Sequence, residues 1–284
     1  MNLSSLWAMW RSQGARGSLR VVADVAFARR SRVADDVVAV ATGARALEVG
    51  GPSRCFRRGG MLPVYPVVAA LDVVTFSTAT LWEGSVREGS PFAPHGRVLG
   101  ARIVGEAAGL TEVRAQSYDV VLSSHCLEHC ADALGALREW RRVCRPDGYL
   151  CLVVPHRDGT FDWRRSVTTL EHYRHDARDE VSEHDTTHFE EIVARHDIRR
   201  DAGVRSPDEL RARLRDNYAT RAAHHHVLTT RSALALVGEA GWSAVAVDVR
   251  RPYDIVVLAQ NRSVVTTLLD PSEALRRSPF ASDH

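Results

Sequence analysis

Histidines are the side chains of this sequence best suited to accept a proton, because an imidazole has a reference pKa near ~6.5. His156 follows Pro155 at the end of an apolar run, where a loop would open into a substrate cavity. We predict His156 and His129 as catalytic bases, although His129 is equally suited to holding its own loop. Other candidates lie after an earlier apolar run and in a long polar stretch, at His125, His172, His184, His188 and His224-His225-His226.

Two histidines of the polar stretch are spaced as metal ligands can be. His184 and His188 lie four residues apart in the run H-D-T-T-H. Imidazole and carboxylate suit a divalent ion, but the order departs from H-E-x-x-H, and histidines beside carboxylates commonly form surface hydrogen bonds. Cys126 and Cys130 also lie beside histidines, yet they alternate with apolar positions, which favours packing. We therefore predict no metal ligand.

A glycine pair follows the first apolar run of the central region. Glu48 and Val49 end this run, and Gly50-Gly51-Pro52-Ser53 comes next. Glycine lets a ligand approach the backbone because no Cβ stands in the way. A dinucleotide site needs G-x-G-x-x-G, and this loop lacks that spacing. The loop disfavours a nicotinamide cofactor, and taken alone it is equally well explained as a tight turn.

The elements that must position these residues alternate between short apolar runs and longer amphipathic segments. Residues 133–144 have helical spacing and stand between two predicted strands, and such crossovers build parallel sheets. A helix at 232–240 precedes two further strands, 243–249 and 254–259, whose short connection makes them antiparallel neighbours. The earlier predicted strands are Ala46–Val49, Val67–Asp72, Arg102–Val104, Tyr118–Ser123 and Tyr149–Val154.

The order of these segments resembles a known family. E-V-G-G, a strand-final aspartate, E-A-A-x-L, S-Y-D-V-V-L-S-S-H-x-L-E-H-x-x-D and R-R-V-C-R-P-D-G-Y-L-x-L-V-V-P follow one another between residues 45 and 155. They look like the successive motifs of class I S-adenosylmethionine-dependent methyltransferases. The resemblance implies an α/β, Rossmann-like, doubly wound sheet of seven strands, mostly parallel with an antiparallel C-terminal strand. It also implies S-adenosyl-L-methionine as cofactor.

The same resemblance assigns residues to the parts of the cofactor. Asp72 ends the second predicted strand, where a carboxylate can accept hydrogen bonds from both ribose hydroxyls; a solvated strand end is the alternative. E-V-G-G-P-S replaces the family's E-x-G-x-G-x-G, so the third glycine is missing. The implied cofactor residues are Glu48, Gly50 and Gly51 at the aminoacyl end, Asp72 at the ribose, Glu106 and Ala107 at the adenine, and Ser124 and His125 beneath the sulfonium.

Composition excludes several classes of protein. Hydrophobic residues make up 45% and charged residues 25%, as in a globular protein. The 37 basic residues are all arginine and are scattered among 35 acidic ones, and the net charge of +2 gives no support for nucleic-acid binding. The five cysteines are widely spaced, which predicts a reducing cytoplasm. No window approaches the ~20 apolar residues of a membrane span.

We predict one main domain with an insertion. The parts are an N-terminal helical cap (1–44), a cofactor-binding core (45–155), an inserted substrate-binding or lid region (156–229), a helix and strand pair that complete the core (230–262), and a surface tail (263–284). The polar insertion suits methyl transfer to oxygen or nitrogen of a small polar molecule, such as a sugar, glycoside or secondary metabolite. The alternative, motivated by the shortened glycine loop, is a degenerate methyltransferase fold that serves as a binding or scaffold protein.

Overall fold

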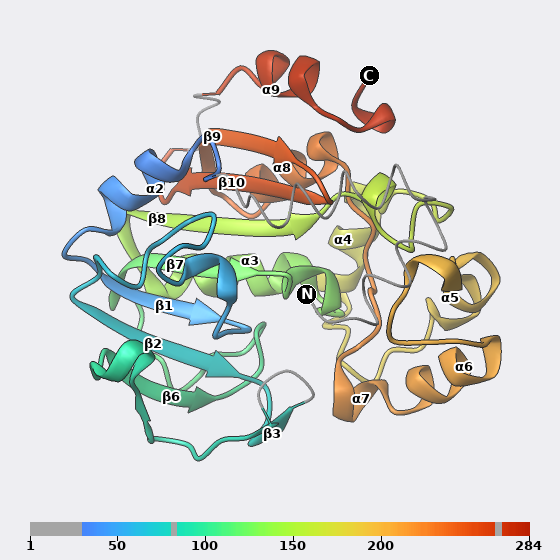
Figure 1. Ribbon diagram of the computed structural model, residues 1–284, viewed down its shortest axis with the longest axis horizontal. Coiled ribbons are helices and arrows are strands. Elements are labelled where there is room, and N and C mark those ends of the chain that lie inside the picture. Colours follow the sequence, from blue (N-terminus) through green and yellow to red (C-terminus); the bar gives the residue numbers. More distant parts are fainter. Residues whose placement is uncertain (1–29, 81–83, 265–268) are drawn as a thin grey trace.

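The computed structural model describes residues 30–80, 84–264 and 269–284, so most of the predicted N-terminal cap lies outside the described residues. One large sheet organises the chain (Figure 1). Its order is β5-β6-β2-β1-β7-β8-β10-β9, and β3 (Ala79–Thr80) pairs separately with β4 (Gly84–Ser85). The strands of the large sheet are β1 (Arg45–Val49), β2 (Ala70–Thr75), β5 (Pro91–Phe92), β6 (Gly100–Val104), β7 (Tyr118–Ser124), β8 (Cys144–Pro155), β9 (Ser243–Arg250) and β10 (Asp254–Gln260).

The strand directions confirm the expected fold class. β6, β2, β1, β7 and β8 run parallel, and β10 is antiparallel to both of its neighbours, β8 and β9. The connection from β9 to β10 is too short to cross the sheet, which forces their antiparallel pairing. The two-residue strand β5 joins β6 at the edge and adds an eighth strand to the seven expected.

The second strand lies three residues later than the sequence predicted. We expected Val67–Asp72, whereas β2 spans Ala70–Thr75 and Val67 belongs to the preceding turn. Pairing with β1 sets the register and places Asp72 beside Leu47, well before the strand ends. A continuous apolar run contains no boundary signal, so the neighbouring strand alone decides where pairing begins.

Helices cover both faces of the sheet. α2 (Ala34–Ala41) and the segment 54–68 pack on one face, and α3 (Ala133–Val143), α4 (Leu170–Arg178) and α8 (Thr230–Glu239) pack on the other. The Asp132 carboxylate caps α3 by accepting a hydrogen bond from the Gly135 amide at 2.7 Å. The buried side chains that face the sheet from α3 recur at helical spacing, as predicted: Leu134, Leu137 and Trp140.

The insertion is attached to the core through α4 and then extends away from it. Tyr173 of α4 is fully buried in the main core. The remaining helices are α5 (Phe189–Arg195), α6 (Pro207–Arg215) and α7 (Asn217–Thr220), and a small core of their own includes Ile192 and Leu210. Figure 1 shows these three helices beyond the carboxyl ends of the parallel strands, where a ligand of such a sheet would lie.

Part of the predicted surface tail packs onto the core. After α9 (Ser272–Arg277), Phe280 and Asp283 are buried, and the Asp283 carboxylate accepts a hydrogen bond from the Thr230 hydroxyl at 2.6 Å. The tail is therefore not a surface extension throughout, because its last residues cap the start of α8. Among the described helices, none combines the length and apolar character needed to cross a membrane.

Candidate active site

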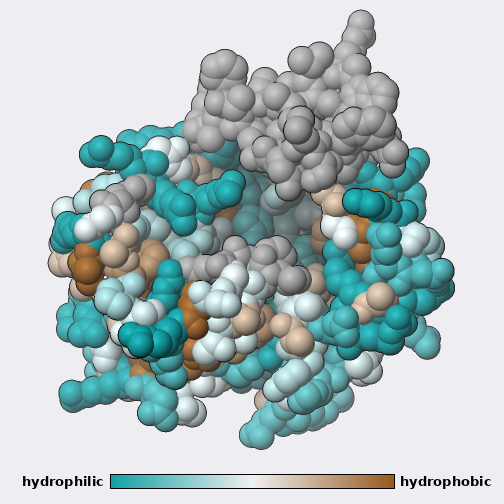
Figure 2. Space-filling model, turned by 60° about the horizontal axis from the view of Figure 1, so that its bottom comes forward, coloured by the Kyte–Doolittle hydropathy of each residue, from teal (hydrophilic) through white to brown (hydrophobic). Residues whose placement is uncertain are grey.

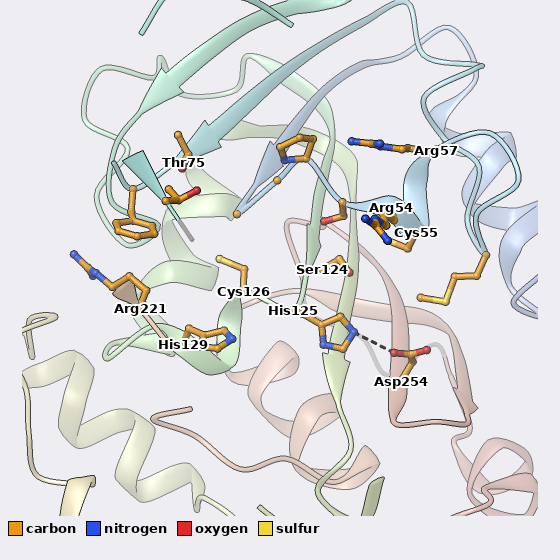
Figure 3. A pocket seen from close by; sticks show the side chains of 17 residues that line it. Arg54, Cys55, Arg57, Thr75, Ser124, His125, Cys126, His129, Arg221 and Asp254 are labelled. Atoms are coloured by element: carbon orange, nitrogen blue, oxygen red, sulfur yellow. Dashed lines mark hydrogen bonds and ion pairs between the residues drawn. The ribbon is translucent and has the colours of Figure 1, made fainter. Parts of the chain in front are cut away.

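A cavity of about 610 Å³ opens at the carboxyl ends of β1, β2 and β7. Its size is typical of small-molecule sites. Figure 2 shows a hollow on this side of the molecule with hydrophilic residues gathered around it, and Figure 3 shows the lining from close by. The lining residues are Gly50, Gly51, Pro52, Ser53, Arg54, Cys55, Arg57, Met61, Thr75, Phe76, Thr80, Ser124, His125, Cys126, His129, Arg221 and Asp254.

The Glu48 carboxylate holds the glycine loop from beneath. It accepts hydrogen bonds from the Ser53 amide at 2.7 Å and from the Tyr65 hydroxyl at 2.5 Å, and the side chain is fully buried. Burial raises the pKa of Glu48 to about 7, although these hydrogen bonds oppose the shift. Glu48 itself is not among the lining residues. Its carboxylate instead shapes the loop that lines the pocket.

The two glycines are required by the space around them. Gly50 has a φ of +77°, and a Cβ on it would lie 2.5 Å from the side chain of Cys126. A Cβ on Gly51 would collide with the carboxyl group of Glu48. Both positions therefore need glycine, because the loop passes close to Cys126 after β7 and to the Glu48 carboxylate that holds it.

His125 lies on the pocket floor between two carboxylates. Its Nε2 is 3.1 Å from Asp254 Oδ1, the contact marked in Figure 3, and its Nδ1 is 3.4 Å from Glu128 Oε1. Burial by itself lowers the pKa of His125, but the hydrogen bonds to Asp254 and Glu128 outweigh it and raise that pKa to about 10. His125 is therefore a cation at neutral pH.

His129 lines the same pocket with the opposite protonation state. Its Nδ1 lies 2.9 Å from the Ala223 carbonyl oxygen, and because a carbonyl only accepts, Nδ1 carries the proton and Nε2 the lone pair. Burial, and then the charge of His224, lower the pKa of His129 to about 4. The ring centroids of His129 and His224 are 4.6 Å apart. At neutral pH, His125 is thus a cation and His129 is a neutral ring.

Residues 75–152, from the end of β2 into β8, match a family model described as a methyltransferase domain. This match includes the ends of β2 and β7 at the pocket, whereas β1 and its glycine loop precede it. The chain thus carries a methyltransferase domain. Its cofactor is accordingly S-adenosyl-L-methionine. A search of curated proteins found no match to the sequence.

Solved methyltransferase structures resemble the chain at low sequence identity. One is 1,6-didemethyltoxoflavin-N1-methyltransferase from Burkholderia thailandensis, with 14% identity over 90% of this chain and 88% of that one, and a TM-score of 0.47. Another is an S-adenosylmethionine-dependent methyltransferase from Mesorhizobium loti, with 13% identity, 80% and 96% coverage, and a TM-score of 0.45. A third, from a complex with the Haloferax volcanii Trm112 methyltransferase activator, has 12% identity, 90% and 97% coverage, and a TM-score of 0.43.

The pocket of this methyltransferase has the chemistry that the cofactor needs. The methionine end of S-adenosylmethionine carries a carboxylate and an ammonium group, and the pocket offers the guanidinium groups of Arg54 and Arg57 and the carboxylate of Asp254. The adenosine end needs a flat apolar contact and hydroxyl partners, and Phe76 and Thr75 supply both at the end of β2. The residues present therefore fit the cofactor.

Asp72, however, does not reach the pocket. Its carboxylate accepts hydrogen bonds from the Ala101 amide at 2.8 Å and the Tyr118 hydroxyl at 2.9 Å, and it lies 3.2 Å from the Arg45 guanidinium. β2 continues three residues beyond Asp72, which is about 10 Å along a strand. The prediction that Asp72 ends the strand is wrong, and Thr75 holds that place in the methyltransferase.

Glu106 and Ala107 also lie outside the pocket lining. Glu106 Oε1 is 2.7 Å from the Arg221 guanidinium, and the Ala107 carbonyl accepts a hydrogen bond from Trp140 Nε1 at 2.9 Å. Of the predicted cofactor residues, the structure brings Gly50, Gly51, Ser124 and His125 into the lining. Glu48, Asp72, Glu106 and Ala107 stand behind it or away from it.

Arg221 is one of several pocket residues that the sequence did not predict. It comes from the insertion, is almost fully buried, and forms ion pairs with Glu106 at 2.7 Å and Glu183 at 2.8 Å. Its guanidinium lies 5.0 Å from the ring centre of Phe76 and 5.0 Å from that of Tyr218. Nothing in the local sequence marks this arginine among 37 basic residues, because its partners are distant in the chain.

His156 does not face the pocket of the methyltransferase. It is fully buried, stacks on Phe280 with ring centroids 4.2 Å apart, and has its Nε2 3.3 Å from Asp283 Oδ1. Its Nδ1 accepts a hydrogen bond from the Asp158 amide at 3.2 Å. The prediction of His156 as a base is wrong in position, because the C-terminal tail covers this end of β8.

His184 and His188 do not face one another either. His184 stacks on Tyr218, with ring centroids 3.9 Å apart. His188 instead has its Nε2 3.2 Å from Nε2 of His172. The four-residue spacing does not place the two side chains on one helix face, because α5 begins only at Phe189.

Proposed function

We propose that this methyltransferase moves a methyl group to oxygen or nitrogen of a small polar molecule, with His129 as the proton acceptor. The observation that carries the proposal is the position of His129 in the pocket lining, with Nδ1 held by a backbone carbonyl at 2.9 Å. An acceptor hydroxyl or ammonium must lose a proton during methyl transfer, and a neutral imidazole can take it.

The cofactor side of the pocket is proposed to bind through backbone and short side chains. Gly50 and Gly51 let the methionine end approach the loop, and Ser124 and His125 lie beneath it. Thr75, in place of Asp72, contacts the ribose, and Phe76 packs on the adenine. When bound, S-adenosyl-L-methionine supplies a methyl group activated by a positively charged sulfur.

The acceptor side of the pocket is proposed to lie between His129 and the segment 221–226. His224 Nδ1 is 2.6 Å from Asp162 Oδ2, and Asp162 is also 3.0 Å from the Arg165 guanidinium. This chain of contacts fixes His224 beside His129. A polar acceptor bound here exchanges water for hydrogen bonds to these rings, which orients its reacting atom.

His125 serves a different purpose in this proposal. With a pKa of about 10 it has no lone pair to offer at neutral pH, so it does not act as the base. It instead places one positive charge between Asp254 and Glu128, and these contacts fix the loop after β7. His125 is therefore a positioning residue for the loop that carries His129.

We also propose that the enzyme works in the cytoplasm. All five cysteines are free thiols, and three of them are buried. Reduced cysteines are the usual state in that compartment.

The test is calorimetric titration with S-adenosylhomocysteine, followed by a methyl-transfer assay with panels of sugars, glycosides, phenols and amines. We expect binding of S-adenosylhomocysteine by the wild-type chain and turnover with at least one small acceptor. Turnover restricted to RNA or protein would overturn the acceptor class. If millimolar S-adenosylhomocysteine fails to bind, the alternative of a scaffold protein on the same fold would be favoured.

A further inference from the structure

The insertion contains a second group of histidines, which lies outside the pocket lining. His172 and Asp176 lie on α4, His188 directly precedes α5, and His226 lies between α7 and α8. One ring nitrogen from each of the three histidines falls within 4.8 Å of the others. These residues come from three separate segments, so folding and not local spacing brings them together.

Two distances in this group, both from His172, match those between ligands of one metal ion. His172 Nε2 lies 3.2 Å from His188 Nε2 and 3.3 Å from Asp176 Oδ2. With metal–nitrogen bonds of about 2.0–2.1 Å in a tetrahedral site, neighbouring ligand atoms stand about 3.3 Å apart. Imidazole and carboxylate are both common zinc ligands.

Asp176 supplies an independent observation. It is only 6% exposed, and its Oδ2 has no hydrogen-bond partner among the described residues. A buried carboxylate without a donor is unfavourable unless a cation lies beside it. Because His172 and Asp176 are four residues apart on one helix, they lie on the same face and their side chains can reach one ion.

His226 is oriented as metal-bound histidines usually are. Its Nε2 lies 3.0 Å from the Ala131 carbonyl oxygen, which can only accept, so Nε2 carries the proton. Nδ1 therefore carries the lone pair, and it is buried with no hydrogen-bond partner in the described part of the chain. A backbone carbonyl that holds the far N–H of an imidazole is the typical support of a metal ligand.

We propose that His172, Asp176, His188 and His226 bind one divalent metal ion of the zinc type. The ion cross-links α4, the start of α5 and the segment that carries His224 and Arg221 toward the pocket. It thereby fixes the wall of the acceptor side without touching the reacting atoms. This proposal does not depend on the identity of the acceptor.

Two other groups of potential ligands are less suited to a metal. Glu128, His129 and His224 lie close together, but Glu128 already has the cationic His125 beside it. Asp185, His188 and His225 form the other group, in which the Asp185 carboxylate accepts hydrogen bonds from the amide and hydroxyl of Thr187. Glu128 and Asp176 are both buried with oxygens that lack a hydrogen-bond donor among the described residues, but the cationic His125 lies 3.4 Å from Glu128.

The experiment is elemental analysis of the full-length protein after purification without chelator, and titration of the chelator-treated protein with Co²⁺. We expect about one zinc per chain and a visible absorption band from tetrahedral Co²⁺, which zinc displaces. His172→Ala and Asp176→Asn should lose most of both signals. His175→Ala is the matched control, because His175 lies on the same helix, is exposed, and pairs with Asp179; it should keep both.

Metal that stays bound in His172→Ala and Asp176→Asn, or that is lost in Asp185→Asn or His224→Ala instead, would overturn this assignment. So would a wild-type chain that binds no more Co²⁺ than His172→Ala. If the four residues only form a hydrogen-bonded cluster, the wild-type chain should bind no more Co²⁺ than His172→Ala does. Because a variant can fail to fold, the wild-type protein is also melted with zinc and with chelator, and equal melting temperatures would contradict the proposal.

Discussion

The two sides of the pocket are built in different ways. The proposed cofactor side uses the loop after β1 and the ends of β2 and β7, where glycine backbone and short side chains form the surface. The proposed acceptor side uses long side chains from η3 (Leu127–His129) and the insertion, held by carbonyl and carboxylate contacts. The first depends on backbone conformation, and the second depends on protonation and distant contacts. Substitutions should therefore have separable effects on binding and on turnover.

The largest effect is expected from His129→Gln. Loss of the base should lower kcat by about 10²–10⁴-fold, while the Kd for S-adenosylhomocysteine changes little, because glutamine can still donate to the Ala223 carbonyl. Steady-state rates and calorimetry measure the two quantities. His184→Gln, outside the pocket, is the control and should leave both unchanged. An unchanged kcat in His129→Gln would remove His129 from the acceptor side.

The pH profile sharpens the same assignment. Since the pKa of His129 lies at about 4, its base form persists well below the usual histidine range. We expect kcat to stay flat from pH 7 down to about 5 and to fall only near pH 4. Rates at saturating acceptor across this range provide the measurement. A fall centred near pH 6.5 would indicate a different base.

The next effect is a pH-dependent change in stability caused by Glu48, whose carboxyl group lies beneath the glycine loop. The folded-state pKa of Glu48 is about 7, above its value of 4.5 when unfolded, so the folded state binds more protons between these values. The stabilisation is complete below pH 4.5 and is lost as pH rises through 7, by up to about 3 kcal/mol. Glu48→Gln should lack this slope in urea unfolding at pH 5 and pH 8. Tyr65→Phe, which keeps the carboxyl group, should retain it.

A smaller effect is expected from Gly50→Ala. The left-handed φ costs about 1–2 kcal/mol, and the added methyl group contacts Cys126, so the loop must shift. We expect S-adenosylhomocysteine to bind about tenfold more weakly by calorimetry, with kcat at saturation little changed. Gly59→Ala is matched in φ, at +80°, but has nothing within 4 Å. Equal loss of affinity in both variants would mean that the loop is not part of the cofactor site.

The smallest effect is expected from Asp72→Asn. Its carboxylate contacts Arg45 and Tyr118 near the other end of β1 and β7, away from the pocket. Affinity for S-adenosylhomocysteine should change by less than about twofold, within the scatter expected for a remote site. Thr75→Val should weaken binding more than Asp72→Asn does. The reverse order would restore Asp72 as the ribose contact.

The candidate site could be predicted from sequence where neighbours in the chain are also neighbours in space. Gly50, Gly51, Ser124 and His125 lie at or just after the ends of buried strands, so recognising the strands located them. The prediction for Asp72 failed because an apolar run does not reveal where strand pairing ends. The prediction for His156 failed because the C-terminal tail that covers this side chain begins more than a hundred residues later in the chain. Arg221 and His224 carried no local signal that separates them from other residues of the polar insertion.

The sequence by itself determined the alternation of strands and helices, the parallel core and the antiparallel last strands, since apolar periodicity and short connections are local properties. The order of its motifs also predicted the methyltransferase domain, and a family model of that description matches residues 75–152. Only the tertiary structure decided which histidine is charged, which is neutral and which is buried under the tail. Those states depend on Asp254, Ala223 and Asp283, each distant in the chain from the histidine that it contacts. Electrostatic and hydrogen-bond environments arise from such contacts, and a linear pattern does not encode them.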